Sequence, residues 1–141
     1  MIRAVLDTNV WVAGLLNRVG APARICDLAL GGAPVLVVSP AIAWEYEKVL
    51  ARPELALPAA EVRSAVAYFK LPGPHVVHVD PTTLPGACTD PNDDHFLAAA
   101  LAGRATAIVT GNLRYFPPSS WKGIRIVAPA AFLRWLPSSE Q

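Results

Sequence analysis

VLDTNVW, residues 5–11, is the stretch from which the fold of this protein can be argued. An apolar run at residues 2–6 has the length of a buried strand, and Asp7 follows it directly. A carboxylate at the end of a buried strand is costly unless it is paired or bound to a metal ion. Asp7 also suits the cap of a helix that would follow, and the two roles are compatible. We therefore expect Asp7 to carry a function.

Short apolar runs alternate with longer segments of helical periodicity, a pattern typical of βα units around a parallel sheet. The predicted strands are residues 2–6, 35–38, 75–79, 105–109 and 124–127. The predicted helices are residues 22–30, 40–51, 58–69, 91–102 and 129–136. Each of these helices begins at a proline, whose missing N–H costs nothing in the first turn. The pattern predicts an α/β fold with three α/β/α layers and a central, mainly parallel sheet.

Four polar positions fall at the edge where open parallel sheets bind ligands, beyond the carboxyl ends of the strands. Asp7 and Ser39 follow the first two strands. The segment 90–94 precedes the fourth predicted helix, and the segment 110–112 follows the fourth strand. Ser39 lacks the GxSxG context of a nucleophile and is expected to cap the next helix. The sequence contains no phosphate-binding glycine motif, so no nucleotide cofactor is expected.

The predicted helix at residues 40–51 carries two acids that point in different directions. Glu45 lies three residues after Ile42 and four before Val49, at the margin of the apolar face. Glu47 points away from that face and is expected to be a solvated surface acid. For Glu45, the periodicity leaves two interpretations open, a boundary residue and a functional carboxylate.

A second acidic group precedes the apolar stretch at residues 96–101. Asp90 fits the cap of the predicted helix, and Asp93 is placed to reach back to it as in a capping box. Asp94 shares a face with Leu97, so its carboxylate is expected to lie close to the core. Crowded carboxylates repel each other, and a divalent cation would relieve that repulsion. Asp94 is therefore the predicted metal ligand, with Asp90 and Asp93 as supporting or helix-start residues.

The length and composition are typical of a single globular domain without a disulfide framework. At 141 residues, with 53% hydrophobic and 16% charged residues, the chain fits one well-packed domain. Cys26 and Cys88 form no disulfide framework or zinc motif, which favours reduced thiols and a cytoplasmic location. No signal peptide or membrane span is expected. The histidines His75, His78 and His95 have no mutual ligand spacing and are expected to be structural or surface residues.

The formal net charge of +1 does not describe how the charges are distributed. If five of the 11 acidic residues share one site, the remaining chain carries 12 basic against 6 acidic residues. A basic surface around an acidic centre suits a phosphodiester substrate. The five acids are Asp7, Glu45, Asp90, Asp93 and Asp94.

In order and spacing, four segments of the sequence resemble the motif blocks of PIN domains. They are VLDTNVW, SPAIAWEYEKVLARP, TDPNDDHFLAAALAG and TAIVTGN. The sequence resembles most closely the bacterial branch of VapC-like toxins, from residue 1 to about residue 136. The resemblance implies a single PIN domain over residues 1–137, and residues 138–141 are expected to be a disordered tail.

The resemblance also implies an activity, that of an endoribonuclease which uses Mg²⁺ or Mn²⁺ and cleaves single-stranded or structured RNA. It implies an acidic triad of Asp7, Glu45 and Asp94, and a shift of one position to Asp93 stays open. Members often form homodimers, and toxin members are neutralised by a small antitoxin. The positions that orient the first acid or its waters match Thr8, Asn9 and Thr110.

One residue departs from the family pattern. Asn112 stands where a T-G-D motif usually ends in an acid. An amide offers an oxygen to a hard cation but no charge, which weakens a second metal site more than the first. Asn112 is therefore expected to belong to the catalytic residues, with Asp7, Glu45 and Asp94, and to assist them through hydrogen bonds.

Two other functions stay open. The amide at Asn112 suggests a catalytically weakened PIN module that only binds RNA. The run Asp7-Thr8-Asn9-Val10 resembles the nucleophile motif of haloacid-dehalogenase-type phosphatases, although Asn9 stands where their general acid is needed. For a nuclease, contacts to the nucleic acid are expected from Arg18, Arg52, Arg114, Lys122 and one of Tyr115 and Phe116.

Overall fold

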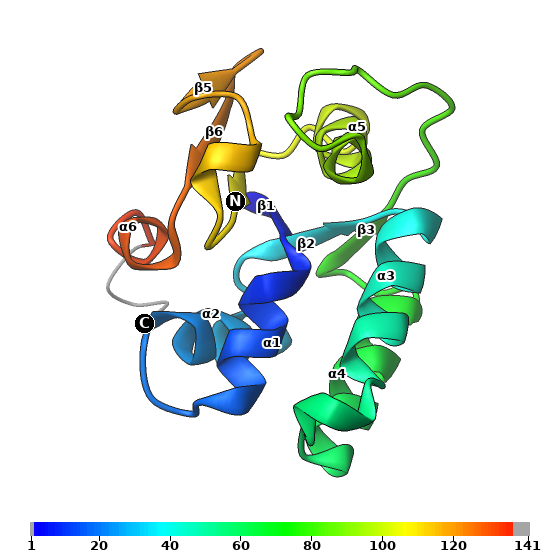
Figure 1. Ribbon diagram of the computed structural model, residues 1–141, viewed down its shortest axis with the longest axis vertical. Coiled ribbons are helices and arrows are strands. Elements are labelled where there is room, and N and C mark those ends of the chain that lie inside the picture. The colour runs from blue at the N-terminus through cyan, green and yellow to red at the C-terminus, as the bar shows by residue number, and fades with distance from the viewer. Residues whose placement is uncertain (1, 137–141) are drawn as a thin grey trace.

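One mixed sheet holds the strands of the computed structural model, which describes residues 2–136 (Figure 1). They are β1 (Arg3–Leu6), β2 (Val35–Val38), β3 (Val76–His78), β4 (Ala107–Val109), β5 (Ser120–Trp121) and β6 (Ile124–Val127). Their order is β3-β2-β1-β4-β6-β5, and all neighbours are parallel except β5, which pairs antiparallel with β6. The predicted, mainly parallel sheet is confirmed. β5 has no counterpart among the predicted strands, because two residues carry no periodic signal.

Three helical segments of the described residues, one α-helix and two 3₁₀ turns, are not predicted by the periodicity. The helical segments of these residues are α1 (Thr8–Leu16), α2 (Ala21–Leu30), α3 (Pro40–Leu50), η1 (Pro53–Leu55), α4 (Ala59–Lys70), η2 (Pro91–Asp93), α5 (Asp94–Ala102), η3 (Leu113–Tyr115) and α6 (Pro129–Leu133), where η marks 3₁₀ turns. The sequence of α1, TNVWVAGLL, is apolar on nearly every side and so shows no helical period. None of these helices has both the length and the apolar character needed to cross a bilayer.

Most predicted boundaries lie within two residues of those in the structure, and two helices differ more. The helix predicted at residues 91–102 begins with the 3₁₀ turn η2, and the helix predicted at residues 129–136 ends at Leu133. The predicted domain end at residue 137 and the predicted tail at residues 138–141 lie outside the described residues.

Helices cover both faces of the sheet, so the predicted three-layer arrangement is confirmed. The helix α5 packs against β1, β2 and β4, while α1, α2 and α6 lie together on the opposite side (Figure 1). From β1 the chain continues outward to β2 and β3, and then returns to β4 on the other side of β1. The strand order therefore reverses between β1 and β4. Ligands of open α/β sheets bind at such a reversal, beyond the carboxyl ends of the strands.

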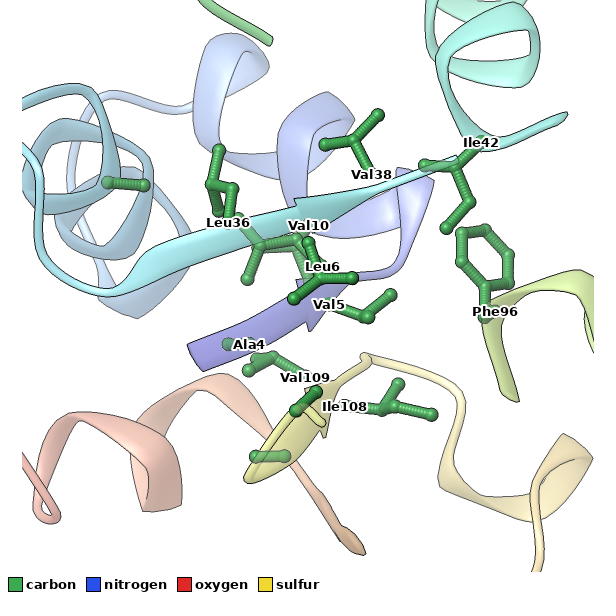
Figure 2. Close-up of a cluster of buried hydrophobic side chains, with 14 of the residues drawn as sticks. Ala4, Val5, Leu6, Val10, Leu36, Val38, Ile42, Phe96, Ile108 and Val109 are labelled. Carbon is green, nitrogen blue, oxygen red and sulfur yellow. The ribbon is translucent and has the colours of Figure 1, made fainter. Parts of the chain in front are cut away.

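The core joins the end of β1 to α3. Leu6 of β1 and Ile42 of α3 belong to one buried cluster, which also includes residues of α5 (Figure 2). Tyr46 of α3 is buried, and its hydroxyl donates a hydrogen bond to the carbonyl of Leu6. Buried polar groups require such partners. This contact ties α3 to the carboxyl end of β1, which brings Glu45 toward Asp7.

Candidate active site

Asp7 lies between β1 and α1, with only 7% of its surface exposed. Its Oδ2 accepts hydrogen bonds from the Thr110 hydroxyl at 2.7 Å and from Asn9 Nδ2 at 3.0 Å. Burial raises the pKa of Asp7, the hydrogen bond from Thr110 opposes this increase, and the charge of Glu45 adds to it. Asp7 occupies the N-cap position of α1, as expected, but its side chain makes no capping hydrogen bond there.

The side chains of Asn9 and Thr110 join two loops around Asp7. Asn9 Oδ1 accepts a hydrogen bond from the backbone N–H of Gly111 at 3.0 Å. Thr110 Oγ1 accepts one from the backbone N–H of Asn112 at 2.9 Å, which leaves the hydroxyl hydrogen for Asp7. The start of α1 and the loop after β4 are thereby held together, and the orientation of the Asp7 carboxylate is set from both sides.

Glu45 is partly buried beside Thr8 and His95. Its Oε2 accepts a hydrogen bond from the Thr8 hydroxyl, and its Oε1 lies 3.3 Å from His95 Nε2. Burial alone would raise the pKa of Glu45, but the contacts with His95 and Thr8 lower it below its usual value. Glu45 is therefore held as an ionised carboxylate, close enough to Asp7 to raise the pKa of that residue.

The neighbouring acids Asp93 and Asp94 have different surroundings. Asp94 is only 4% exposed, and its Oδ1 accepts the backbone N–H groups of Ala87 and Cys88 at 3.0 and 2.9 Å. Asp93 instead lines the same hollow as Asp7. Burial, followed by the charge of Asp7, raises the pKa of Asp93 from 3.8 to about 6. Asp94 lies against the core, as its helical position predicts, and of the two acids Asp93 is the one that lines the hollow with Asp7.

Asp90 and Asn112 lie at the rim of the same hollow. The Oδ1 atom of Asp90 accepts a hydrogen bond from the backbone N–H of Asn92 at 3.0 Å. The predicted capping role of Asp90 is therefore confirmed, although the helix that it begins is the 3₁₀ turn η2. Asn112 is exposed, so its amide is accessible to a ligand of the hollow.

The hollow over Asp7 has a volume of about 440 Å³ and adjoins a larger one of about 710 Å³ beside α3. The side chains of Val49 and Arg52 line both hollows, so the two are neighbours on the surface. We treat them together and call them the active-site groove. Asp7 and Asp93 lie in its smaller part, and Glu45 lies in its larger part.

The side chains around the hollow offer few ligands for a divalent metal ion. Within residues 2–136, no three His, Cys, Asp or Glu side chains stand close enough together to enclose an ion. Two carboxylates, from Asp7 and Asp93, do meet in one hollow beside the Asn112 amide. Mg²⁺ typically keeps several waters and takes one or two protein carboxylates together with substrate phosphates. The residues therefore fit an open, hydrated ion rather than a closed cage.

The expected contacts to nucleic acid divide between the groove and other surfaces. Arg52 and Tyr115 line the groove. Phe116 is buried, with 6% exposure, so its expected role in base stacking is wrong. Arg18 pairs with Asp27 at 2.7 Å, beside α2. Arg114 lies against the Tyr115 ring, while Lys122 lies beside Trp121 and lines a different hollow.

His95 belongs to the site although its spacing suggested a surface or structural residue. Its ring contacts the Glu45 carboxylate from α5. The signal in the sequence is its place just after the acidic run, before the apolar residues that bury α5. A single histidine at such a position carries no ligand spacing, so only the meeting of α3 and α5 reveals the contact.

Comparison with known proteins agrees with this geometry. Residues 3–114, which include Asp7, Glu45, Asp93 and Asn112, match the PIN domain family. The uncharacterized protein MJ1680 of Methanocaldococcus jannaschii is 29% identical over 111 residues, which cover 79% of this chain and 71% of that protein. PIN domains are generally nucleases that use divalent metal ions and act on nucleic acids. The chain belongs to the PIN domain family.

Proposed function

We propose that this protein is an endoribonuclease that depends on Mg²⁺ or Mn²⁺, with Asp7 and Asp93 as its metal-binding carboxylates. The observation that carries the proposal is the pair of buried or half-buried carboxyl groups in one hollow at the reversal of the sheet, where burial raises the pKa of each. Neighbouring carboxylates that repel each other gain from a shared cation. The groove also exposes Arg52, a cation suited to phosphate.

The polar residues in and beside the groove have distinct parts in the proposed reaction. A bound divalent ion lowers the pKa of water and stabilises charge on the phosphate. Thr110 and Asn9 hold Asp7 in position, and Asp93 lines the same hollow. Glu45 stays ionised at neutral pH and orients the attacking water, while His95 holds Glu45.

Asp94 has a supporting role in this proposal instead of the expected role of metal ligand. Its Oδ1 is occupied by the N–H groups of Ala87 and Cys88. These bonds fasten the loop before η2 to the start of α5, and so fix the direction of the adjacent Asp93. Asn112 completes the site through its amide oxygen.

The resemblance to VapC-like toxins leads to a further proposal about biological role. We propose that the protein acts in the cytoplasm as the toxin of a toxin–antitoxin pair, as a homodimer that a small antitoxin neutralises. Growth of a bacterial host that expresses the wild-type chain should slow, whereas expression of Asp7→Asn at the same level should not slow it. Equal growth of the two cultures would contradict the toxin role and leave the nuclease proposal to the cleavage assay.

That assay uses a fluorescent, mixed-sequence RNA incubated with Mg²⁺, with Mn²⁺, or with EDTA. We expect internal cleavage with either ion and none with EDTA. One observation favours a second function, a PIN module that binds RNA without cleaving it: Asn112 brings an uncharged amide to the hollow. RNA binding without cleavage under both metal conditions would select that function.

Replacing Asn112 by aspartate adds a charge to the hollow, so it should tighten divalent-ion binding. The Mg²⁺ concentration for half-maximal cleavage should fall by about 10-fold, because this ion depends strongly on anionic oxygen ligands. Titration by calorimetry and by cleavage rate measures the change. Identical curves for the two proteins would mean that the Asn112 side chain only shapes the turn after β4.

The two acids of α3 offer a matched comparison. Replacing Glu45 by glutamine should slow cleavage by about 10- to 100-fold, the range found for groups that orient ligands and water. Glu47 pairs with Lys70 at 3.0 Å on the surface, as its direction predicts. Replacing Glu47 by glutamine should therefore change cleavage by less than about 2-fold, since exposed ion pairs contribute little. Equal rates for the two variants, measured at saturating Mg²⁺, would remove Glu45 from the mechanism.

A further inference from the structure

Trp44 is a large apolar side chain that the fold leaves in water. It precedes Glu45 on α3, where Ile42 and Tyr46 are buried in the core, and it is 62% exposed. Residues at this helical angle point away from the sheet, so packing within the domain does not explain a tryptophan here. An exposed indole is suited to contact a flat partner group.

Trp44 lies in the larger part of the active-site groove, next to two cations. The ammonium of Lys48 is 4.7 Å from the centroid of the Trp44 ring. Lys48 and Arg52 line the groove with Trp44, and Arg52 continues into the smaller part that holds Asp7. Within residues 2–136, neither Lys48 nor Arg52 forms an ion pair, whereas Lys70 of α4 does.

An aromatic ring followed by two cations matches the alternating bases and phosphates of a nucleic acid strand. Phosphates are attracted by unpaired cations, and aromatic rings stack on bases of any sequence because every base has a π face. The path runs from the Trp44 ring, past Lys48 and Arg52, to the carboxylates of Asp7 and Asp93. A base held in a duplex is already stacked and paired, so only an unpaired base can reach an indole in this way.

We propose that Trp44 is a stacking platform for an unpaired base of the substrate, with Lys48 and Arg52 holding the phosphates between that base and the cleavage site. The proposal rests on the proposed function, because it takes the carboxylates of Asp7 and Asp93 as the place of cleavage. It makes Trp44 a residue that selects single-stranded segments. Tyr115, which lines the other part of the groove beside Arg114, lies away from this platform.

Binding can be measured apart from cleavage in the Asp7→Asn background. The probe is a fluorescein-labelled, mixed-sequence 12-nucleotide RNA, whose anisotropy reports the Kd at several salt concentrations. Replacing Trp44 by alanine should weaken binding by about 10-fold, which corresponds to about 1.4 kcal/mol and lies in the range for one stacked base. Replacing Trp44 by phenylalanine should restore most of the affinity. An otherwise identical abasic strand should bind the wild-type and alanine side chains equally.

The two lysines beside tryptophans provide a matched control for charge. Lys122 is 5.3 Å from the centroid of the Trp121 ring but lies outside the active-site groove. Replacing Lys48 by alanine should reduce the slope of log Kd against log salt by about 1, whereas replacing Lys122 by alanine should leave it unchanged. Equal changes for the two lysines would contradict the proposed path of the strand.

The stacking proposal and the proposed function can fail separately. Metal-dependent cleavage by the parent protein, with less than a 2-fold change in Kd on Trp44→Ala, would overturn the stacking platform alone. An equal loss of affinity for the normal and abasic strands would also overturn it, because the contact would then not involve a base. If Trp44→Ala altered only self-association in size-exclusion chromatography, the indole would belong to an interface between protein chains. A parent protein that neither binds nor cleaves RNA would overturn both proposals.

Discussion

Replacing Asp7 by asparagine is expected to reduce metal-dependent RNA cleavage by more than about 100-fold while the fold stays intact. Groups that merely support a metal ligand account for about 10- to 100-fold, so the loss of a direct ligand should exceed that range. The amide can keep the hydrogen bond from Thr110, but it lacks the charge that attracts the cation. Cleavage rates at several Mg²⁺ concentrations measure the effect.

Thermal unfolding separates a lost ligand from a lost fold. Without metal, the melting temperature of Asp7→Asn should equal or exceed that of the wild type, because burial and the charge of Glu45 already disfavour the Asp7 carboxylate. The control variant is Asp27→Asn, which removes an exposed acid paired with Arg18. It should retain full cleavage. Wild-type activity in Asp7→Asn would remove Asp7 from the metal site.

The second large effect is a contrast between two adjacent acids. Replacing Asp93 by asparagine should reduce cleavage by more than about 100-fold, whereas Asp94→Asn should retain cleavage within about 10-fold, because an amide oxygen can still accept the loop N–H groups. Replacing Asp94 by alanine removes that acceptor from Ala87 and Cys88, and should lower the free energy of unfolding by about 2 kcal/mol. Urea unfolding and cleavage by the folded protein measure the two effects. The opposite pattern of cleavage would assign the metal to Asp94.

The pH dependence of stability gives a second readout for Asp93. Its pKa in the folded protein is about 6, above the usual 3.8, so the folded state binds this proton more tightly than the unfolded state. The corresponding contribution to stability is fully present below about pH 4 and is lost as the pH rises through 6. Without metal, Asp93→Asn should remove this decline between pH 4 and 7. Mg²⁺ should stabilise the wild type above pH 6 more than it stabilises the variant.

Local pattern is sufficient to predict most of the sheet. The strands at residues 35–38 and 124–127 agree with the structure at both ends. The first is a continuous apolar run, as buried parallel strands are, and the second alternates buried isoleucines with the exposed Arg125. A continuous apolar run also makes α1 hard to predict, because its apolar residues are buried on more than one side and show no helical period. Helical periodicity also predicts that Glu45 lies at the margin of the apolar face of its helix. It cannot predict the contacts of Glu45 with Thr8 and His95, because these residues come from two other helices.

The sequence alone determined where Asp7 would lie, because a carboxylate directly after a buried parallel strand can only emerge at the carboxyl edge of the sheet. It also determined that an acidic group would begin the helix after residue 90. Only the tertiary structure distinguishes the surroundings of Asp93 from those of Asp94. Adjacent residues at a helix start point about 100° apart, and both have apolar residues at helical spacing after them. The difference comes from the loop before η2, whose N–H groups at Ala87 and Cys88 donate to Asp94, while Asp93 lines the hollow together with Asp7.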